Sequence, residues 1–218
     1  MLLYHAPMAQ AKTYKRRFQS KARAEKYARR FESGSHKRID AREQRAVAKI
    51  FAGLEGCQTV LDVPCGARRF GKTLGQGDRR VIETDVAHEM VEIARRAHRL
   101  GVQSDAAHLP FRNGAVDCVF SNRLLHHILP RDERAVFLRE FQRVSRRWVV
   151  VTFFDYRMFA TVRKALKKLK RARVRYDEQP TFEQFEAEVM AGGFRIVKVV
   201  LTGPVWVAEK YLVLEKAH

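Results

Sequence analysis

At 218 residues with 46% hydrophobic content, the chain is long enough to bury one sizeable core, and we expect a single globular unit. Its 43 Lys and Arg against 24 Asp and Glu give a formal net charge of +19, which favours anionic partners such as nucleic acid, lipid or acidic small molecules. Three scattered cysteines exclude a disulfide framework or a zinc site and favour a reducing, cytoplasmic compartment. No apolar run approaches the roughly 20 residues that span a bilayer, so membrane attachment would be peripheral.

The N-terminal quarter of the chain predicts two helices. Residues 13–33 are basic, with Tyr14 and Tyr27 among aromatic residues at near-helical spacing, and Ser33-Gly34-Ser35 ends that segment. Asp40-Ala41-Arg42-Glu43 has the form of a capping box, which predicts a second helix from Asp40 to about Leu54. We expect residues 1–55 to form a helical cap on a main domain of residues 56–218.

Strand patterns then alternate with helical patterns to the end of the chain. Strands are expected at 59–63, 80–85, 102–105, 116–121, 148–154, 194–200 and 206–214, with helices near 69–75, 87–99, 131–144 and 181–191. This alternation predicts an α/β fold, a doubly wound and mostly parallel sheet with helices on both faces. Only Thr202-Gly203-Pro204 separates the last two strands, which is too short for a parallel crossover, so the last strand is expected to be antiparallel.

A basic insertion at about 155–178 interrupts this alternation. Phe159, Val162, Leu166 and Leu169 recur there at helical spacing, while eight cations and no acid lie between Tyr156 and Arg175. The segment predicts contact of residues 156–175 with an anionic substrate or an anionic membrane surface.

The stretch from Val60 to Phe70 carries the strongest functional signal. Its apolar run ends in Asp62, Pro64 and Gly66 make a tight turn, and Asp85 ends the next apolar run about 20 residues later. This is the layout of a nucleotide-type cofactor site in an open α/β sheet. An isolated strand-end Asp is more often a turn or helix-capping residue, so the ordered set of motifs carries the inference.

Taken with Asp105-Ala106, Leu109-Pro110-Phe111 and Val116–Ser121, these motifs resemble the class I S-adenosylmethionine (SAM)-dependent methyltransferases, specifically the type 11 branch. The resemblance covers residues 57–154 well and the remainder to 218 loosely. It implies a Rossmann-like sheet of seven strands whose last strand is antiparallel. It also implies that SAM is the cofactor.

The resemblance assigns the first loop to the methionine part of SAM. Asp62 would hold the ammonium group, directly or through water, and Pro64 and Gly66 would form the loop that faces it. Arg68 stands where the family has a small residue. Its side chain would either crowd the carboxylate of the cofactor or pair with it, and the sequence leaves both outcomes open.

The later motifs are assigned to the nucleoside and to the methyl group. Asp85 would accept from both ribose hydroxyls, and Met90 would cover the adenine. Asp105 with Ala106 would contact the adenine amino group and a ring nitrogen. Ser121 closes the fourth strand, where the family places substrate and catalytic groups.

Two histidines follow that strand. His126 or His127 could act as a general base near neutral pH, although a packed or solvated histidine pair at a helix start is the alternative reading. The segment lacks the Asn/Asp-Pro-Pro-aromatic signature of enzymes that methylate amino groups of bases or glutamine, which counts against those substrates.

Three functions are therefore compatible with the sequence. The first is a SAM-dependent methyltransferase that acts on a small-molecule or lipid-linked anionic acceptor. The second is an RNA-directed methyltransferase whose basic helices bind phosphates. The third is a degenerate methyltransferase fold that serves as a basic binding module, with Arg68 blocking the cofactor.

Overall fold

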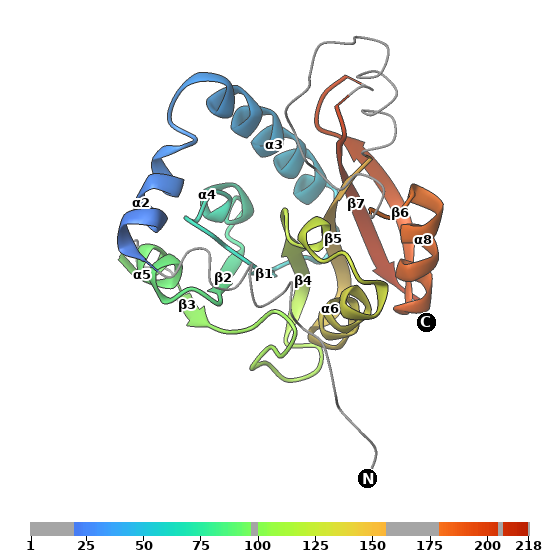
Figure 1. The fold of residues 1–218 in the computed structure, drawn as a ribbon. Coiled ribbons are helices and arrows are strands. Elements are labelled where there is room, and N and C mark those ends of the chain that lie inside the picture. The colour runs from blue at the N-terminus through green and yellow to red at the C-terminus, as the bar shows by residue number, and fades with distance from the viewer. Residues whose placement is uncertain (1–19, 97–99, 156–178, 205–206, 218) are drawn as a thin grey trace.

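The computed structural model describes residues 20–96, 100–155, 179–204 and 207–217. They form one α/β unit in which helices flank a single central sheet (Figure 1). Its strands are β1 (Thr59–Asp62), β2 (Arg80–Asp85), β3 (Leu100–Gln103), β4 (Val116–Ser121), β5 (Ser145–Phe154), β6 (Phe194–Leu201) and β7 (Glu209–Lys216). Its helices are α2 (Lys21–Arg29), α3 (Gly34–Ala52), α4 (Gly71–Leu74), α5 (His88–Arg96), the 3-10 turn η1 (Leu125–His127), α6 (Arg131–Val144) and α8 (Phe182–Ala191).

The seven strands hydrogen-bond in the order β3-β2-β1-β4-β5-β7-β6. β7 pairs antiparallel with both of its neighbours, and the other strand pairs are parallel, as the sequence predicts. The strand order reverses between β1 and β4, which lie side by side although two strands separate them in sequence. In open α/β sheets a ligand binds beyond the carboxyl ends of the strands at such a reversal.

Alternate residues of the central strands contribute their side chains to two separate hydrophobic cores, one on each face of the sheet. Leu61 of β1 and Val119 of β4 pack with α6 and α8, whereas Val60 and Phe120 pack with α3 and α4. Successive side chains of a strand point to opposite faces, so strands that are apolar at every position need cover on both sides. The helices on the two faces supply that cover and fix the sheet edge where the loops gather.

Helix α8 begins and ends where the sequence predicts. The Thr181 hydroxyl accepts from the Gln184 backbone N–H, the Gln184 side chain accepts from the Thr181 N–H, and Gly192 caps the other end. The backbone groups that have no intrahelical partner at either end of α8 therefore find partners within a few residues. This explains why the sequence alone locates the helix.

The capping box expected at Asp40 is wrong. Helix α3 begins at Gly34, so Asp40 and Glu43 lie inside it rather than at its start. Both carboxylates instead accept from the side chain of Arg69. A tertiary ion pair uses the acids that a cap would have used, and the helix extends by two turns toward its N-terminus.

Several expectations fall outside the described residues or stay predictions. Tyr14 and the basic insertion, including the apolar stripe of residues 156–175, lie outside them. The division into a cap of residues 1–55 and a main domain of residues 56–218 stays a prediction. No helix within the described ranges has the length and apolarity that crossing a membrane requires.

Candidate active site

A cleft of about 180 Å³ opens where the loops after β1, β2 and β4 meet helices α2 and α5. A smaller cavity of about 20 Å³ adjoins it and shares Pro64 and Asp85 with it. Six of the predicted site residues line the larger cleft: Pro64, Gly66, Asp85, Met90, His126 and His127. Asp105 and Ala106 line the smaller one. The fold therefore gathers at one edge motifs that span more than 60 residues of sequence.

Asp85 is the carboxylate shared by the two cavities. One of its oxygens accepts from the Gly66 backbone N–H at 3.0 Å and the other from the Ala87 N–H at 2.9 Å. The residue is only 8% exposed, and this burial raises the pKa of Asp85 to about 6, although the backbone hydrogen bonds oppose the shift. Each oxygen retains acceptor capacity, so the carboxylate is a fixed acceptor for two donors.

Gly66 permits the close approach that this loop requires. Its φ of 52° lies in the left-handed region, which glycine adopts without strain. A Cβ at this position would lie 3.4 Å from the Tyr27 ring of α2. Tyr27 therefore covers the loop from the other side of the cleft, and its role as a lid stays a prediction.

Asp62 lies behind the cleft rather than on its wall. The residue is 1% exposed, and its Oδ2 atom has no hydrogen-bond partner. Burial, together with the neighbouring charges of Glu83 and Asp85, holds the pKa of Asp62 well above its usual range. An unsatisfied buried carboxyl is costly unless a ligand or a water supplies a donor.

The residues assigned to adenine and to the fourth strand differ in position. Met90 is buried against Ala87 and Ala24 beneath the cleft. Asp105 accepts from the Ala107 N–H at 3.1 Å, so it makes a turn contact as well as lining the smaller cavity. Ser121 is buried and lines neither cavity.

The arginine that faces the cleft is Arg69 and not its neighbour Arg68. Arg68 has a positive φ of 49° and lines neither cavity. Arg69 lines the larger cleft, and its Nη2 atom lies 2.6 Å from a carboxylate oxygen of both Asp40 and Glu43. Its Nη1 atom is buried without a partner, and the guanidinium carbon lies 3.7 Å from the centre of the Phe31 ring.

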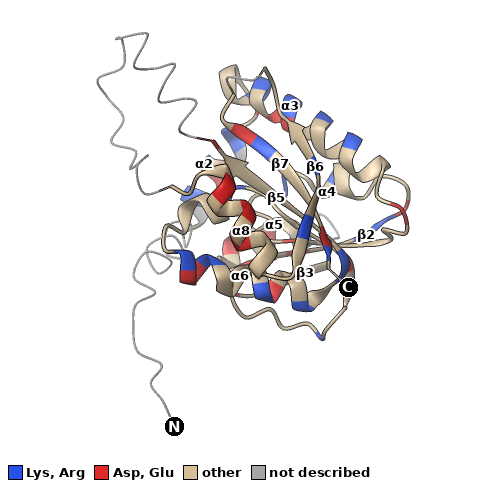
Figure 2. Cartoon of the chain, turned by 90° about the vertical axis from the view of Figure 1, so that its right-hand side faces the viewer, with Lys and Arg blue, Asp and Glu red and all other residues tan. Residues whose placement is uncertain are grey.

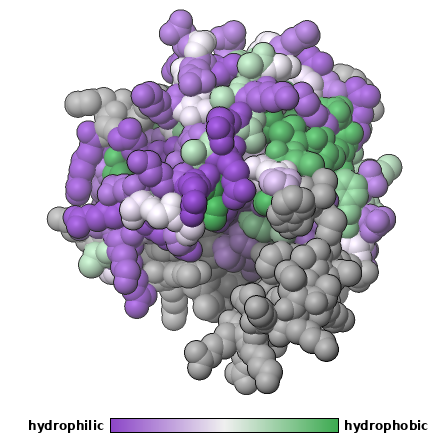
Figure 3. Space-filling model, turned by 90° about the horizontal axis from the view of Figure 1, so that it is seen from above, coloured by the Kyte–Doolittle hydropathy of each residue, from purple (hydrophilic) through white to green (hydrophobic). Residues whose placement is uncertain are grey.

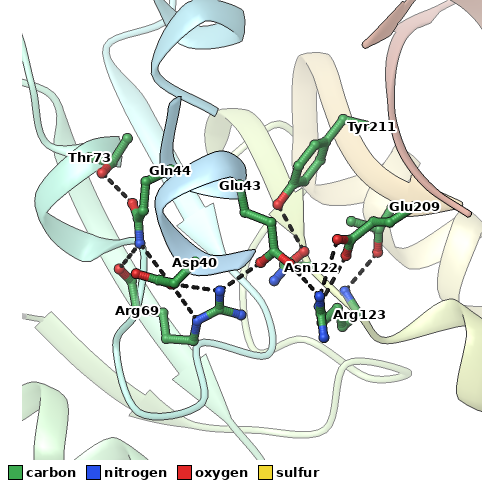
Figure 4. A network of polar contacts seen from close by, with 10 residues as sticks. Asp40, Glu43, Gln44, Arg69, Thr73, Asn122, Arg123, Glu209 and Tyr211 are labelled. Carbon is green, nitrogen blue, oxygen red and sulfur yellow. Dashed lines mark hydrogen bonds and ion pairs between the residues drawn. The ribbon is translucent and has the colours of Figure 1, made fainter. Parts of the chain in front are cut away.

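A second arginine extends this polar network across the cleft (Figure 4). Arg123 follows β4 and pairs with Glu43 of α3 and with Glu209 of β7. Tyr211 donates to Asn122 at 3.0 Å beside it. Hydrogen-bond partners up to 89 positions apart in sequence therefore meet in one largely buried cluster.

The two carboxyls of the network respond differently to burial. Burial alone would raise the pKa of Glu43, but the hydrogen bond from Glu209 and the charges of Arg69 and Arg123 lower it. Burial and the charge of Glu43 raise the pKa of Glu209 to about 8. Glu209 therefore keeps its proton near neutral pH, and Glu43 carries the negative charge.

The histidine pair lies on the opposite wall. Burial, then His127 and Arg123, hold the pKa of His126 well below its usual range, so its imidazole is neutral at physiological pH. Its Nδ1 atom is buried without a partner, and its ring centre lies 4.4 Å from that of Phe154. His126 is therefore packed, as expected for a histidine with a structural role, but it is also neutral, which is the protonation state that a general base needs.

Sequence reasoning missed Arg69, Arg123 and the two glutamates that hold them. Asp40 and Glu43 were visible as acids one helical turn apart, but they indicated a cap. No local signal connects Glu43 with Arg123 or Glu209, because they lie on α3, the loop after β4, and β7. The cleft-lining aromatic Phe31 was visible only as part of a helical repeat.

Comparison with known proteins identifies the central part of the chain. Residues 61–153 match the model of a methyltransferase domain family. A malonyl-[acyl-carrier protein] O-methyltransferase from Hamiltonella defensa is 32% identical over 128 residues, which cover 58% of this chain and 46% of that protein. The tRNA (carboxymethyluridine(34)-5-O)-methyltransferase alkbh8 of Xenopus tropicalis is 32% identical over 102 residues, covering 46% of this chain and 16% of that one. The chain thus spans less than half the length of these relatives.

Solved structures share the fold over nearly the whole chain. Magnesium protoporphyrin IX methyltransferase (ChlM) from Synechocystis PCC 6803, with bound S-adenosylhomocysteine (SAH), has a TM-score of 0.74 at 18% identity and covers 95% of this chain and 100% of its own. A SAM-dependent methyltransferase from Aquifex aeolicus has a TM-score of 0.64 at 19% identity, covering 91% and 99%. At these identities the likeness concerns the fold alone.

Proposed function

We propose that the chain is a class I SAM-dependent methyltransferase, which transfers the methyl group of SAM to an anionic acceptor that is a small molecule or is linked to a lipid or a carrier. The observation that carries the proposal is Asp85, a buried carboxylate that two backbone amides fix at the junction of two cavities. A fixed pair of acceptor oxygens matches the two donors of a ribose diol.

Two buried polar atoms, one behind the cleft and one on its wall, fit an amino-acid group. Asp62 Oδ2 is an acceptor without a donor, and Arg69 Nη1 is a donor without an acceptor. The two side chains lie close enough for the charge of Arg69 to influence the pKa of Asp62. The methionine part of SAM offers an ammonium group and a carboxylate, so we assign Asp62 to the former and Arg69, rather than Arg68, to the latter.

When bound, SAM supplies an electrophilic methyl group on a positively charged sulfur. The residues of this chain bind and orient the reactants, which is the main requirement of an in-line displacement. Tyr27, Phe31 and Met90 add apolar surface to the wall of the cleft. The neutral imidazole of His126 can accept a proton where the acceptor must lose one.

The charge of the cleft supports an anionic acceptor. Three arginines line it, namely Arg30, Arg69 and Arg123, and Asp85 is the one carboxylate among the described lining residues. One similar protein is named for an acceptor that is a malonyl group on a carrier protein. This name and the local charge favour an acidic acceptor over a basic one.

Calorimetric titration with SAH tests the function directly. We expect SAH to bind, and Asp85→Ala to weaken binding more than Glu83→Ala, because Glu83 lines neither cavity. An absence of binding at millimolar SAH would favour the basic binding module instead. A larger effect of Glu83→Ala would mean that the ribose contact is assigned to the wrong residue of β2.

An RNA acceptor is the second candidate. Basic positions recur along α3 (Figure 2), and Arg38, Arg45 and Lys49 are exposed, since both acids of this helix turn inward to Arg69. The face seen from above is mainly hydrophilic (Figure 3), and one similar protein is named as a tRNA methyltransferase. Specific, salt-sensitive binding of transfer RNA over random RNA, lost on Arg38→Gln with Arg45→Gln, would favour this candidate.

The recruitment of an anionic substrate or lipid surface by residues 156–175 stays a prediction, because the segment lies outside the described residues. Changing Lys164, Lys167, Lys168 and Arg171 to Gln should leave SAH affinity intact and reduce binding to anionic liposomes, and added salt should mimic the loss. A loss of SAH affinity would instead make the segment part of the cofactor site.

A further inference from the structure

Arg123 has a free guanidinium edge at Nη1, whose two N–H groups make no hydrogen bond to the described residues. Its Nε and Nη2 atoms donate to Glu209 at 3.0 and 3.1 Å, and Nη2 also donates to Glu43. The side chain is 30% exposed and lines the larger cleft, so this edge is available to a ligand.

The position of this edge is fixed before any ligand arrives. The Arg123 backbone N–H donates to the Thr152 hydroxyl at 2.7 Å, and its guanidinium carbon lies 5.7 Å from the centre of the Phe154 ring. Two buried glutamates hold the guanidinium plane from the side away from the cleft. A pre-organised arginine loses little conformational entropy when it binds an anion.

The net charge around Arg123 favours the binding of one more anion. Asp40 and Glu43 are the acidic partners of Arg69 and Arg123, and Arg30 adds a third, exposed cation at the cleft. The pKa of Glu209, raised to about 8 by burial and by Glu43, means that this residue does not neutralise Arg123 at neutral pH. The field at Nη1 therefore favours a negatively charged group.

The chemistry of the surroundings narrows the kind of anion. His126 also lines the cleft, and its ring packs against Phe154. Because burial holds the pKa of His126 well below its usual range, its imidazole is a weak base toward an acceptor that must lose a proton. An alcohol or an ammonium acceptor must lose a proton during methyl transfer, whereas a carboxylate has none to lose. A carboxylate oxygen also accepts a charge-assisted hydrogen bond from the Nη1 N–H groups of Arg123.

Resting on the SAM-dependent function proposed above, we propose that Arg123 binds the carboxylate of the acceptor and that this carboxylate is itself methylated. One carboxylate oxygen forms the new bond to the methyl carbon, and the electron pair of the broken carbon–sulfur bond stays on sulfur. The products are a neutral methyl ester and SAH, and no proton is released. Loss of the negative charge weakens the ester's attraction to Arg123 and favours its departure.

A binding experiment tests whether Arg123 binds a carboxylate, without requiring turnover. Adipate, 1,6-hexanediol and inorganic phosphate are titrated into the SAH complexes of the wild type, Arg123→Gln, Arg123→Lys and Arg147→Gln. Arg147 is the matched control, because it is an exposed arginine that pairs with Glu215 away from the cleft. We expect adipate to bind the wild type and to bind Arg123→Gln at least tenfold more weakly. The affinity for adipate should be partly restored in Arg123→Lys and should equal that of the wild type in Arg147→Gln. Adipate binding that is absent, matched by hexanediol or phosphate, or unaffected by Arg123→Gln would overturn the proposal.

The methylated product gives an independent readout. With methyl-labelled SAM and either adipate, hexanediol or hexanediamine, we expect label in adipate that alkali releases as volatile methanol. An alkali-stable product, or no label in adipate, refutes methylation of the carboxylate. SAH affinity separates this failure from that of the proposed function: if SAH binds and adipate does not, only the present inference falls.

Discussion

Protonation of Asp85 should control cofactor affinity in mildly acidic solution. With a pKa of about 6, Asp85 is about 90% ionised at pH 7 and about 10% ionised at pH 5. Ribose hydroxyls donate to the ionised form, so the affinity follows the ionised fraction, and the Kd for SAH should rise about tenfold from pH 7 to pH 5. SAH itself has no group that titrates in this range.

Calorimetry across pH 5–8 on three proteins measures this effect. Asp85→Asn should bind SAH more weakly at pH 7 by about 1.5–3 kcal/mol, the range for hydrogen bonds to a charged group, and should lose the pH dependence. Glu83→Gln is the matched control, because Glu83 is buried in the same strand but lines neither cavity, and it should keep the slope. An equal slope in wild type and Asp85→Asn would refute the assignment of Asp85 to the ribose.

Three further predictions concern the arginines and the buried carboxyls. Arg68→Gly should leave SAH affinity unchanged while Arg69→Gln weakens it, since only Arg69 lines the cleft; calorimetry that shows the opposite order would restore Arg68 to the site. Glu43→Ala should lower the free energy of unfolding by about 3–5 kcal/mol in urea, because it removes the buried carboxylate that Arg69 and Arg123 share, and a loss below about 1 kcal/mol would contradict a structural role. The pKa of Glu209 rises from 4.5 unfolded to about 8 folded, so its stabilising contribution is complete below pH 4.5 and is lost as pH rises through 8. Glu209→Gln should flatten that decline in unfolding experiments from pH 5 to 9, and an unchanged slope would assign the decline to another group.

The sequence determined those features that local chemistry specifies. Continuous apolar runs predicted the strands and the helices that cover both faces of the sheet. The short link at Thr202 predicted an antiparallel last strand, and Thr181 with Gln184 located α8. The glycine at position 66 and the carboxylate at position 85 predicted one cofactor site, and in the fold they lie together, since the Gly66 N–H donates to Asp85. Each of these signals rests on residues close in sequence or on a motif whose order is fixed by the sheet.

Tertiary structure alone decided which charged side chains pair with one another. Glu43 resembles the end of a capping box in sequence, but in the fold it is fully buried between Arg69 and Arg123, and α3 begins one helical turn and more before Asp40. Choosing Arg69 over Arg68 depended on backbone direction after the turn, which residue identity does not reveal. The proton on Glu209 likewise depends on burial beside a carboxylate 166 positions away, since Glu43 and Glu209 are brought together by packing of α3 over β7. Charged side chains carry no periodic signal for a distant partner, because the desolvation and ion pairing that select the partner arise only after the chain has packed.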